Sequence, residues 1–81
     1  MSKNNLDSIA NVVRSIMEDP PETLDYDAQL QTDLGIDSLL LVELIISLEE
    51  HFNFEFDDMD LVMENFLSVR AIDEFLKAKL Q

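Results

Sequence analysis

The stretch DLGIDSLLLVELIISLEEHF, residues 33–52, contains the longest uninterrupted helical pattern of the chain. Leu, Ile, Val and Glu dominate its second part, and neither Gly nor Pro interrupts it, so we expect one helix over Ser38–Phe52. Asp37 is suited to cap the start of this helix, and Asn53 is suited to end it. The only glycine, Gly35, stands just before the helix, where its backbone freedom permits a sharp turn into the first helical residue.

Two further segments show helical spacing on either side of this stretch. The apolar residues of residues 6–17 recur at intervals of three and four, which predicts a helix with Asn5 or Ser2 as its cap. The proline pair that follows is expected to terminate it. Near the C-terminus, Ser68 precedes a second set with the same period, which predicts a capped helix over residues 69–80.

The segments between these helices are less regular. Residues 19–37 have a few apolar anchors and no steady period, so we expect a long ordered loop, a feature that is often functional. A short helix is expected over Asp57–Met63, with Leu61 and Val62 facing inward. The predicted fold class is therefore all-α, a small bundle of three main helices plus one short helix, with a long loop between the first two.

Composition limits the size of the domain and the kinds of partner. Residues 1–81 are expected to form one small domain with an ordered core over about residues 6–80. The chain has no Cys and one His, which excludes disulfides and argues against a zinc site, so we expect no bound metal. Eighteen acidic residues face five basic ones, for a net charge of -13. Nucleic acid and anionic membranes are therefore poor partners. Proteins with basic patches suit this charge, although solubility alone also explains it.

The N-terminal residues carry no pattern of an export signal. Residues 1–5 are polar and no apolar run follows them, so we expect no secretory signal and a cytoplasmic location. The longest apolar run, residues 39–42, is far too short to cross a bilayer.

The junction before the main helix is the candidate functional site. Ser38 is placed in the first turn of that helix, where unpaired N–H groups and the helix dipole favour an attached anion such as a phosphate. An ordinary capped junction between a loop and a helix has the same spacing and is common. Spacing alone therefore leaves both interpretations open. No convincing nucleophile and base pair is present elsewhere, so we do not expect an enzyme.

Residues 33–39, Asp-Leu-Gly-Ile-Asp-Ser-Leu, resemble the phosphopantetheine attachment motif of acyl carrier proteins. Val-Glu-Leu at residues 42–44 and Leu-Glu-Glu-His-Phe at residues 48–52 continue the resemblance along the following helix. Residues 68–76 resemble the last helix of the family. The likeness extends over residues 6–80, where the first third agrees by pattern and not by motif.

The resemblance implies a specific role for the junction. Ser38 is the expected attachment point of 4′-phosphopantetheine, which a phosphopantetheinyl transferase takes from coenzyme A, and Asp37 and Gly35 complete the attachment motif. The thiol of the arm then holds the acyl cargo as a thioester, so the reactive sulfur comes from the cofactor. The chain itself is expected to be a non-catalytic, monomeric carrier. Its expected partners are an acyltransferase, a ketosynthase, or an adenylating or ligase enzyme with a basic docking patch.

The main helix carries two apolar stripes at about 100° per residue. One stripe is expected to face the core and consists of Leu41, Leu44, Ile45, Leu48 and Phe52. The second stripe is either covered by the short helix and the loop, or partly exposed as a partner surface, and the resemblance favours exposure. Apolar anchors framed by carboxylates suit a groove on a basic enzyme. The expected partner-binding residues are Leu39, Leu40, Val42, Glu43, Ile46, Glu49 and Glu50.

Two features bear on the pathway. Leu40 and Leu41 stand where carriers of fatty acid synthesis often have a polar pair, and Leu40 is expected to add apolar surface near the arm. Residues 64–68, Glu-Asn-Phe-Leu-Ser, look more like free-standing carriers of polyketide or nonribosomal peptide pathways. We therefore expect a carrier of polyketide or related secondary-metabolite biosynthesis. Fatty acid synthesis is the alternative, as is an acidic adaptor with the carrier fold that binds partners without an arm.

Overall fold

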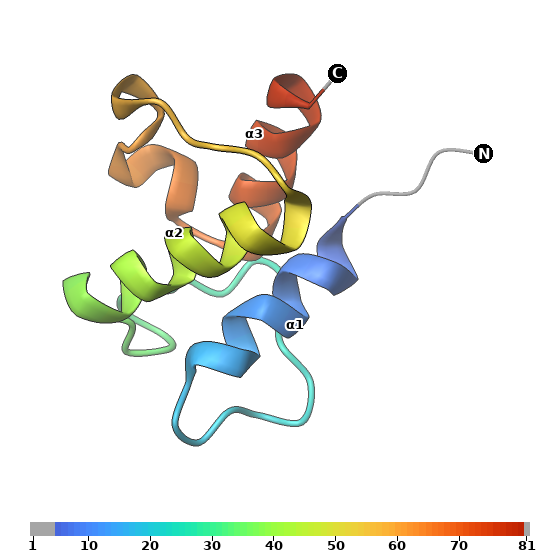
Figure 1. Ribbon diagram of the computed structural model, residues 1–81. Helices are drawn as coiled ribbons and strands as arrows, with labels where there is room; N and C mark the ends of the chain where they lie inside the picture. The colour runs from blue at the N-terminus through green and yellow to red at the C-terminus, as the bar shows by residue number, and fades with distance from the viewer. Residues whose placement is uncertain (1–4, 81) are drawn as a thin grey trace.

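Three α-helices and two short 3₁₀ turns make up the chain in the computed structural model, which describes residues 5–80 (Figure 1). The helices are α1 (Leu6–Ile16), α2 (Ser38–Phe52) and α3 (Val69–Lys79). The 3₁₀ turns are η1 (Asp58–Asp60) and η2 (Met63–Phe66). No residue between 5 and 80 lies in a strand. The predicted all-α class is confirmed.

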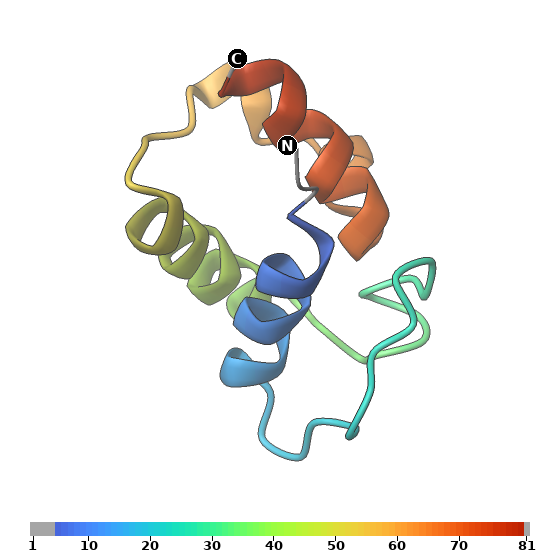
Figure 2. The same cartoon turned by 90° about the vertical axis from the view of Figure 1, so that its right-hand side faces the viewer.

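The core lies where the three helices meet. α1 packs against both α2 and α3, and η2 packs against α3, as the rotated view also shows (Figure 2). Each helix contributes residues three or four positions apart, because that spacing places side chains on one face. The long loop and η2 add side chains of their own to the same cluster. The most deeply buried apolar side chains are those of Ile9, Val13, Leu30, Ile36, Leu44, Leu48, Phe66, Val69, Ile72 and Leu76.

Two helices begin with the side-chain caps that the sequence predicts. The Leu40 N–H donates to the Asp37 carboxylate at 2.9 Å, and the Ala71 N–H donates to the Ser68 hydroxyl at 3.1 Å. At the other end of α2, Asn53 adopts a left-handed conformation with φ of 57°. These contacts fix the bounds of α2 and the start of α3 where the sequence predicts them.

The start of α1 uses a different device. Asn5 occupies the cap position, but its side chain makes no capping hydrogen bond. Its backbone N–H instead donates to the carboxylate of Asp73 in α3 at 2.8 Å. The alternative cap, Ser2, lies outside the described residues. The expected side-chain cap by Asn5 is therefore wrong, and the N-terminal end of α1 is tied to a distant helix.

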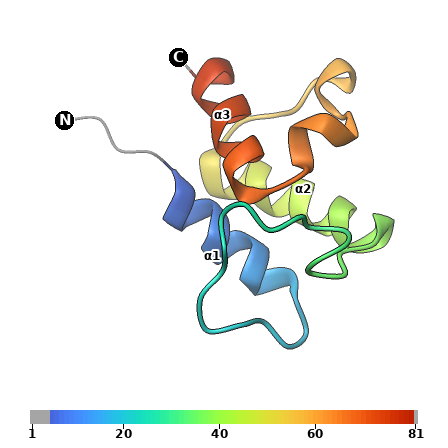
Figure 3. The same cartoon turned by 180° about the vertical axis from the view of Figure 1, so that it is seen from behind.

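The long loop between α1 and α2 is pinned along its length. Figure 3 shows it running from the end of α1 past the start of α3 to the start of α2. The Leu30 N–H donates to the Leu67 carbonyl at 2.9 Å, and the Arg70 N–H donates to the Tyr26 carbonyl at 2.9 Å. The Arg70 guanidinium also pairs with Asp27 at 2.6 Å. The loop is thus an ordered part of the fold, as predicted.

The predicted short helix over residues 57–63 is wrong. Two separate 3₁₀ turns replace it, because Val62 between them is extended, with φ of -117° and ψ of 148°. Asp57 and Asp60 close a capping box that fixes the start of the first turn. Leu61 and Val62, which were expected to face inward, are 44% and 43% exposed. The apolar contact of this region with the core comes from η2 instead.

Candidate functional site

Ser38 is the first residue of α2, and its side chain is exposed. Among residues 5–80, its hydroxyl has no hydrogen-bond partner. A hydroxyl that is both exposed and unpaired is open to an approaching enzyme. A buried oxygen could not be modified, and the Ser38 oxygen belongs to an exposed residue.

The two residues before Ser38, Ile36 and Asp37, fix its position. Ile36 is 1% exposed, and its N–H donates to the Leu30 carbonyl at 2.9 Å, which anchors the end of the loop in the core. Asp37 is extended, with φ of -84° and ψ of -174°, and its carboxylate holds the Leu40 N–H. Because a buried anchor and a helix cap are neighbours in sequence, the serine that follows has a defined place at the helix start.

Gly35 has a φ of 70°, in the left-handed region that residues with a Cβ rarely adopt. A Cβ at this position would meet no atom within 4 Å. The glycine is therefore required by the backbone angle and not by a close contact, and the space beside it is open. The turn before it is closed by Asp33, whose carboxylate accepts the Gln29 N–H at 2.9 Å.

The two apolar stripes of α2 lie as the helical period predicts. Leu44 and Leu48 are fully buried, and the other members of the first stripe are partly buried against the core. The second stripe is exposed along the helix that starts with Ser38: Leu39, Val42 and Ile46 are 67%, 52% and 50% exposed. The expectation that this stripe is uncovered is confirmed.

The remaining residues of the expected partner surface differ in their exposure. Glu43 and Glu50 are exposed. Glu49 is partly buried, and its carboxylate accepts the Phe56 N–H at 2.9 Å. Leu40 is partly buried against the core, so it adds less free apolar surface near Ser38 than expected. Their role in partner binding stays a prediction.

Three ion pairs formed by lysines of α3 were not anticipated from the sequence. Asp73 is 2% exposed, accepts the Asn5 N–H, and forms an ion pair with the Lys77 ammonium, which lies 3.2 Å away. The spacing of Asp73 and Lys77 by four residues is a signal that could have indicated the pair. Lys79 contacts both Asp57 and Asp60, a pairing that only the tertiary structure reveals.

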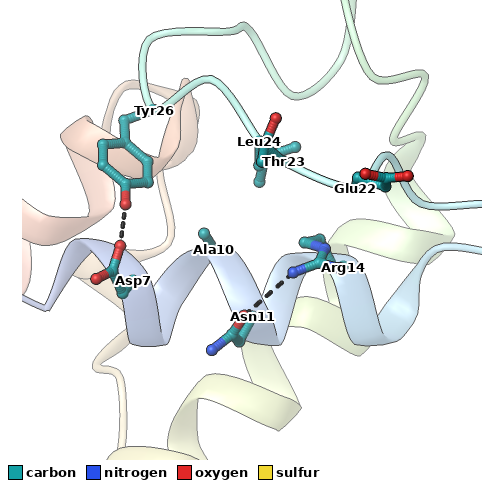
Figure 4. A pocket seen from close by; sticks show the side chains of 8 residues that line it. All are labelled: Asp7, Ala10, Asn11, Arg14, Glu22, Thr23, Leu24 and Tyr26. Carbon is teal, nitrogen blue, oxygen red and sulfur yellow. Dashed lines mark hydrogen bonds between the residues drawn. The ribbon is translucent and has the colours of Figure 1, made fainter.

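A hollow of about 340 Å³ lies between α1 and the loop (Figure 4). The Tyr26 hydroxyl donates to the Asp7 carboxylate, and this hydrogen bond raises the pKa of Tyr26. The Arg14 guanidinium donates to the Pro21 carbonyl at 3.1 Å and to Asn11 at 3.4 Å. These groups are engaged in joining the loop to α1, and none of the lining residues belongs to α2. The hollow is therefore part of the packing interface between α1 and the loop, and it does not include Ser38.

Comparison with known proteins places this geometry in a family. The family described as "Phosphopantetheine attachment site" matches residues 7–76, a range that contains Gly35, Asp37 and Ser38. The chain belongs to the phosphopantetheine-binding carrier proteins. Membership of this family makes the chain a carrier.

The carrier is similar to acyl carrier proteins from several organisms. It is 36% identical to an acyl carrier protein of Desulforapulum autotrophicum over 77 residues, which cover 89% of this chain and 97% of that one. It is 40% identical to acyl carrier protein 2, mitochondrial, of Arabidopsis thaliana over 90% of this chain and 60% of that one. It is 36% identical to acyl carrier protein 3 of Ralstonia nicotianae over 65% of this chain and 61% of that one. The carrier thus spans about three fifths of the length of two of these relatives and nearly all of the third.

A solved structure has the same fold as the carrier. A chain in the crystal structure of the Bradyrhizobium japonicum glycine:[carrier protein] ligase complexed with glycylated carrier protein aligns with a TM-score of 0.76. The alignment covers 86% of this chain and 95% of that chain, at 24% identity.

The residues at the start of α2 fit the cofactor of the family. The exposed Ser38 hydroxyl offers an oxygen for a phosphodiester, and the space next to Gly35 is open. When bound, phosphopantetheine supplies a thiol that forms a thioester with the cargo, and the carrier, which has no Cys, supplies none. Among residues 5–80 there is no group of three or more potential metal ligands. No helix in that range has the length and apolar character needed to span a bilayer.

Proposed function

We propose that Ser38 carries the 4′-phosphopantetheine arm, and that the protein delivers acyl, polyketide or aminoacyl groups on it, as thioesters, to partner enzymes. The observation that carries this proposal is the exposed, unpaired hydroxyl at the first residue of α2. A phosphodiester on that oxygen lies at the positive end of the α2 dipole, which favours it. The ordered loop and the Asp37 cap hold the attachment point still while the arm moves.

The experiment that tests this proposal is enzymatic loading. The protein is incubated with coenzyme A and a promiscuous phosphopantetheinyl transferase, and its intact mass is measured. We expect one arm to be added to the parent and none to Ser38→Ala. Ser15→Ala is the matched control, because Ser15 is also exposed on a helix and its loss should leave loading unchanged. A parent protein that gains no arm, or a Ser38→Ala variant that still gains one, contradicts the proposal.

The partners that suit this surface are enzymes with an apolar groove rimmed by Arg and Lys. Leu39, Val42 and Ile46 supply exposed apolar contacts, and the exposed carboxylates of Glu43 and Glu50 lie on the same helix. An apolar centre with a charged rim is typical of transient protein interfaces. We propose an acyltransferase, a ketosynthase, or an adenylating or ligase enzyme as the partner class, in addition to the transferase that loads the arm. The structural neighbour was crystallised in complex with a glycine:[carrier protein] ligase, which supports the last of these classes.

For the pathway we propose polyketide or related secondary-metabolite biosynthesis, with fatty acid synthesis as the alternative. Identification of the acyl group on protein isolated from its native host separates the two. A simple saturated chain supports fatty acid synthesis, and a polyketide or aminoacyl group supports the first proposal. If the isolated protein binds a basic partner and carries no arm, it is an acidic adaptor; such binding is salt-sensitive and survives Ser38→Ala.

A further inference from the structure

The chain between Phe56 and Phe66 forms a strap, residues 57–65, whose two ends meet. The rings of Phe56 and Phe66 are in edge contact, with centroids 5.4 Å apart. Phe56 also stacks on Phe75 of α3 at 5.7 Å. Phe66 is 2% exposed. We call the paired rings of Phe56 and Phe66 the neck of the strap. Aromatic packing therefore fixes this neck to α3.

Beyond the neck, none of the strap residues 57–65 is buried. η1 contains no buried residue. Met59 is 88% exposed, and Leu61, Val62 and Met63 are each more than 40% exposed. A segment with so little buried apolar surface is not held in place by the hydrophobic effect.

The strap is, however, well bonded within itself. The Asp60 N–H donates to the Asp57 carbonyl at 2.9 Å, and the Asp57 N–H donates to the Asp60 carboxylate at 2.9 Å. The Asn65 side-chain amide donates to the Asp60 carbonyl at 2.8 Å. These bonds connect residues of the first 3₁₀ turn to one another and to Asn65 of the second.

Within residues 5–80, one side chain of α3, that of Lys79, makes the ion pairs of the strap. The Lys79 ammonium lies 2.6 Å from the Asp60 carboxylate and 2.9 Å from the Asp57 carboxylate. The side chains of Lys79 and Asp60 are only 25% and 19% exposed, so water screens this pair less than an open surface pair. The hydrogen bond to Lys79 lowers the pKa of Asp60, and Asp60 raises the pKa of Lys79. Both partners are therefore charged around neutral pH. Among residues 5–80, one other polar contact joins a strap residue to the rest of the protein. It is long, 3.9 Å from the Gln31 amide nitrogen to the Met63 sulfur.

We propose that Lys79 is an ionic latch that closes the strap onto α3, and that the strap opens locally, with loss of its internal hydrogen bonds and with the contact between Phe56 and Phe66 kept, when this charge is removed or paired elsewhere. Opening moves the exposed apolar side chains of the strap relative to α2 without unfolding the bundle. The carboxylates that Lys79 holds then become available to a cationic side chain of a partner. This inference does not depend on modification of Ser38.

Amide exchange measured by NMR tests the latch, with two variants that change the net charge in opposite directions. Lys79→Met removes a positive charge and keeps an unbranched stem, and Asp60→Asn removes a negative charge. The latch predicts that both variants speed exchange of the strap amides by about three- to tenfold. General repulsion within an acidic protein instead predicts opposite effects. The reporter amides are those of Asp60, Leu61, Val62 and Asn65, each of which donates a hydrogen bond within the strap.

Two controls complete the design. Asp58→Asn removes a carboxylate of the same turn that forms no salt bridge among residues 5–80, and it should leave exchange at the parent rate. Lys79→Arg keeps the charge and should restore slow exchange. Unchanged exchange in both Lys79→Met and Asp60→Asn overturns the proposal. Faster exchange throughout α1 and α2 in these variants overturns it as well, because it shows that Lys79 supports the whole bundle and not the strap alone.

Discussion

Asp37 connects the backbone of the loop to the chemistry proposed for the serine beside it. Its carboxylate accepts the Leu40 N–H at 2.9 Å, so it fixes where α2 begins, and it thereby makes Ser38 the first helical residue. A shift of that boundary by one residue toward the C-terminus would place Ser38 at the non-helical cap position instead of in the first turn. The cap is therefore a determinant of where the hydroxyl points.

We expect Asp37→Ala to lower the free energy of unfolding by about 1 kcal/mol, because the Leu40 N–H loses its acceptor. Asp37→Ser retains an acceptor at the cap and should recover most of this loss. Urea unfolding followed by circular dichroism measures both variants. Equal stability of the Ala and Ser variants would show that the cap contributes nothing and that Asp37 matters, if at all, through its charge.

At this scale, local signals in the sequence were sufficient to locate the candidate site, and the resemblance to acyl carrier proteins was needed to assign its chemistry. Ser38, Asp37 and Gly35 could be predicted because a glycine, a capping residue and a helix start are neighbours in sequence. Asp73 could not, because one of its partners, the Asn5 N–H, belongs to the opposite end of the chain. A buried carboxylate whose partners come from tertiary contacts leaves only a weak trace in the sequence, here its spacing from Lys77.

Among the elements, the long loop contributes most to placing the site. Leu30 is 1% exposed, donates its N–H to Leu67 and accepts from Ile36, two residues before the serine. It therefore links the η2–α3 junction to the end of the loop. A loop held in this way behaves as part of the core, although it has no regular secondary structure.

We expect Leu30→Ala to lower the free energy of unfolding by about 2–4 kcal/mol, because it leaves a cavity at a fully buried position. Met59→Ala is the control: it also shortens a long apolar side chain, but at a position that is 88% exposed, so its effect should stay within about 0.5 kcal/mol. Chemical unfolding of the two variants makes the comparison. Similar losses for both would show that burial in the loop does not stabilise the fold.

The elements also show where sequence patterns fail. The three main helices follow from apolar periodicity and caps, because each buries one stripe along its length. The region 57–66 does not, because its apolar residues follow no helical period. Its first turn is held by a capping box and by an ion pair with Lys79. The sequence pattern places Lys79 only in a last helical turn, where a cation suits the helix dipole.

For the molecule as a whole, the net charge of -13 opposes the compact state. Among residues 5–80, salt bridges involve only four of the acidic side chains, those of Asp27, Asp57, Asp60 and Asp73. The other carboxylates repel one another across the surface. The same charge limits the stability of the folded state, and we expect it to favour association with basic partners.

Added salt should therefore stabilise the protein, because it screens this repulsion more than it weakens the few ion pairs. We expect the melting temperature at neutral pH to rise by about 5 °C between low salt and physiological salt. Thermal unfolding in a series of NaCl and MgCl₂ concentrations measures this rise. A melting temperature that is insensitive to both salts would show that the acidic surface is not a source of strain.

The most direct measurement is the fragmentation of the loaded protein in a mass spectrometer, after digestion, to find the residue that carries the added group. We predict that phosphopantetheine is found on the peptide that contains Ser38, and that it occupies this serine alone. Attachment to any other serine, or a chain that stays unmodified under conditions that load a known carrier, contradicts the account.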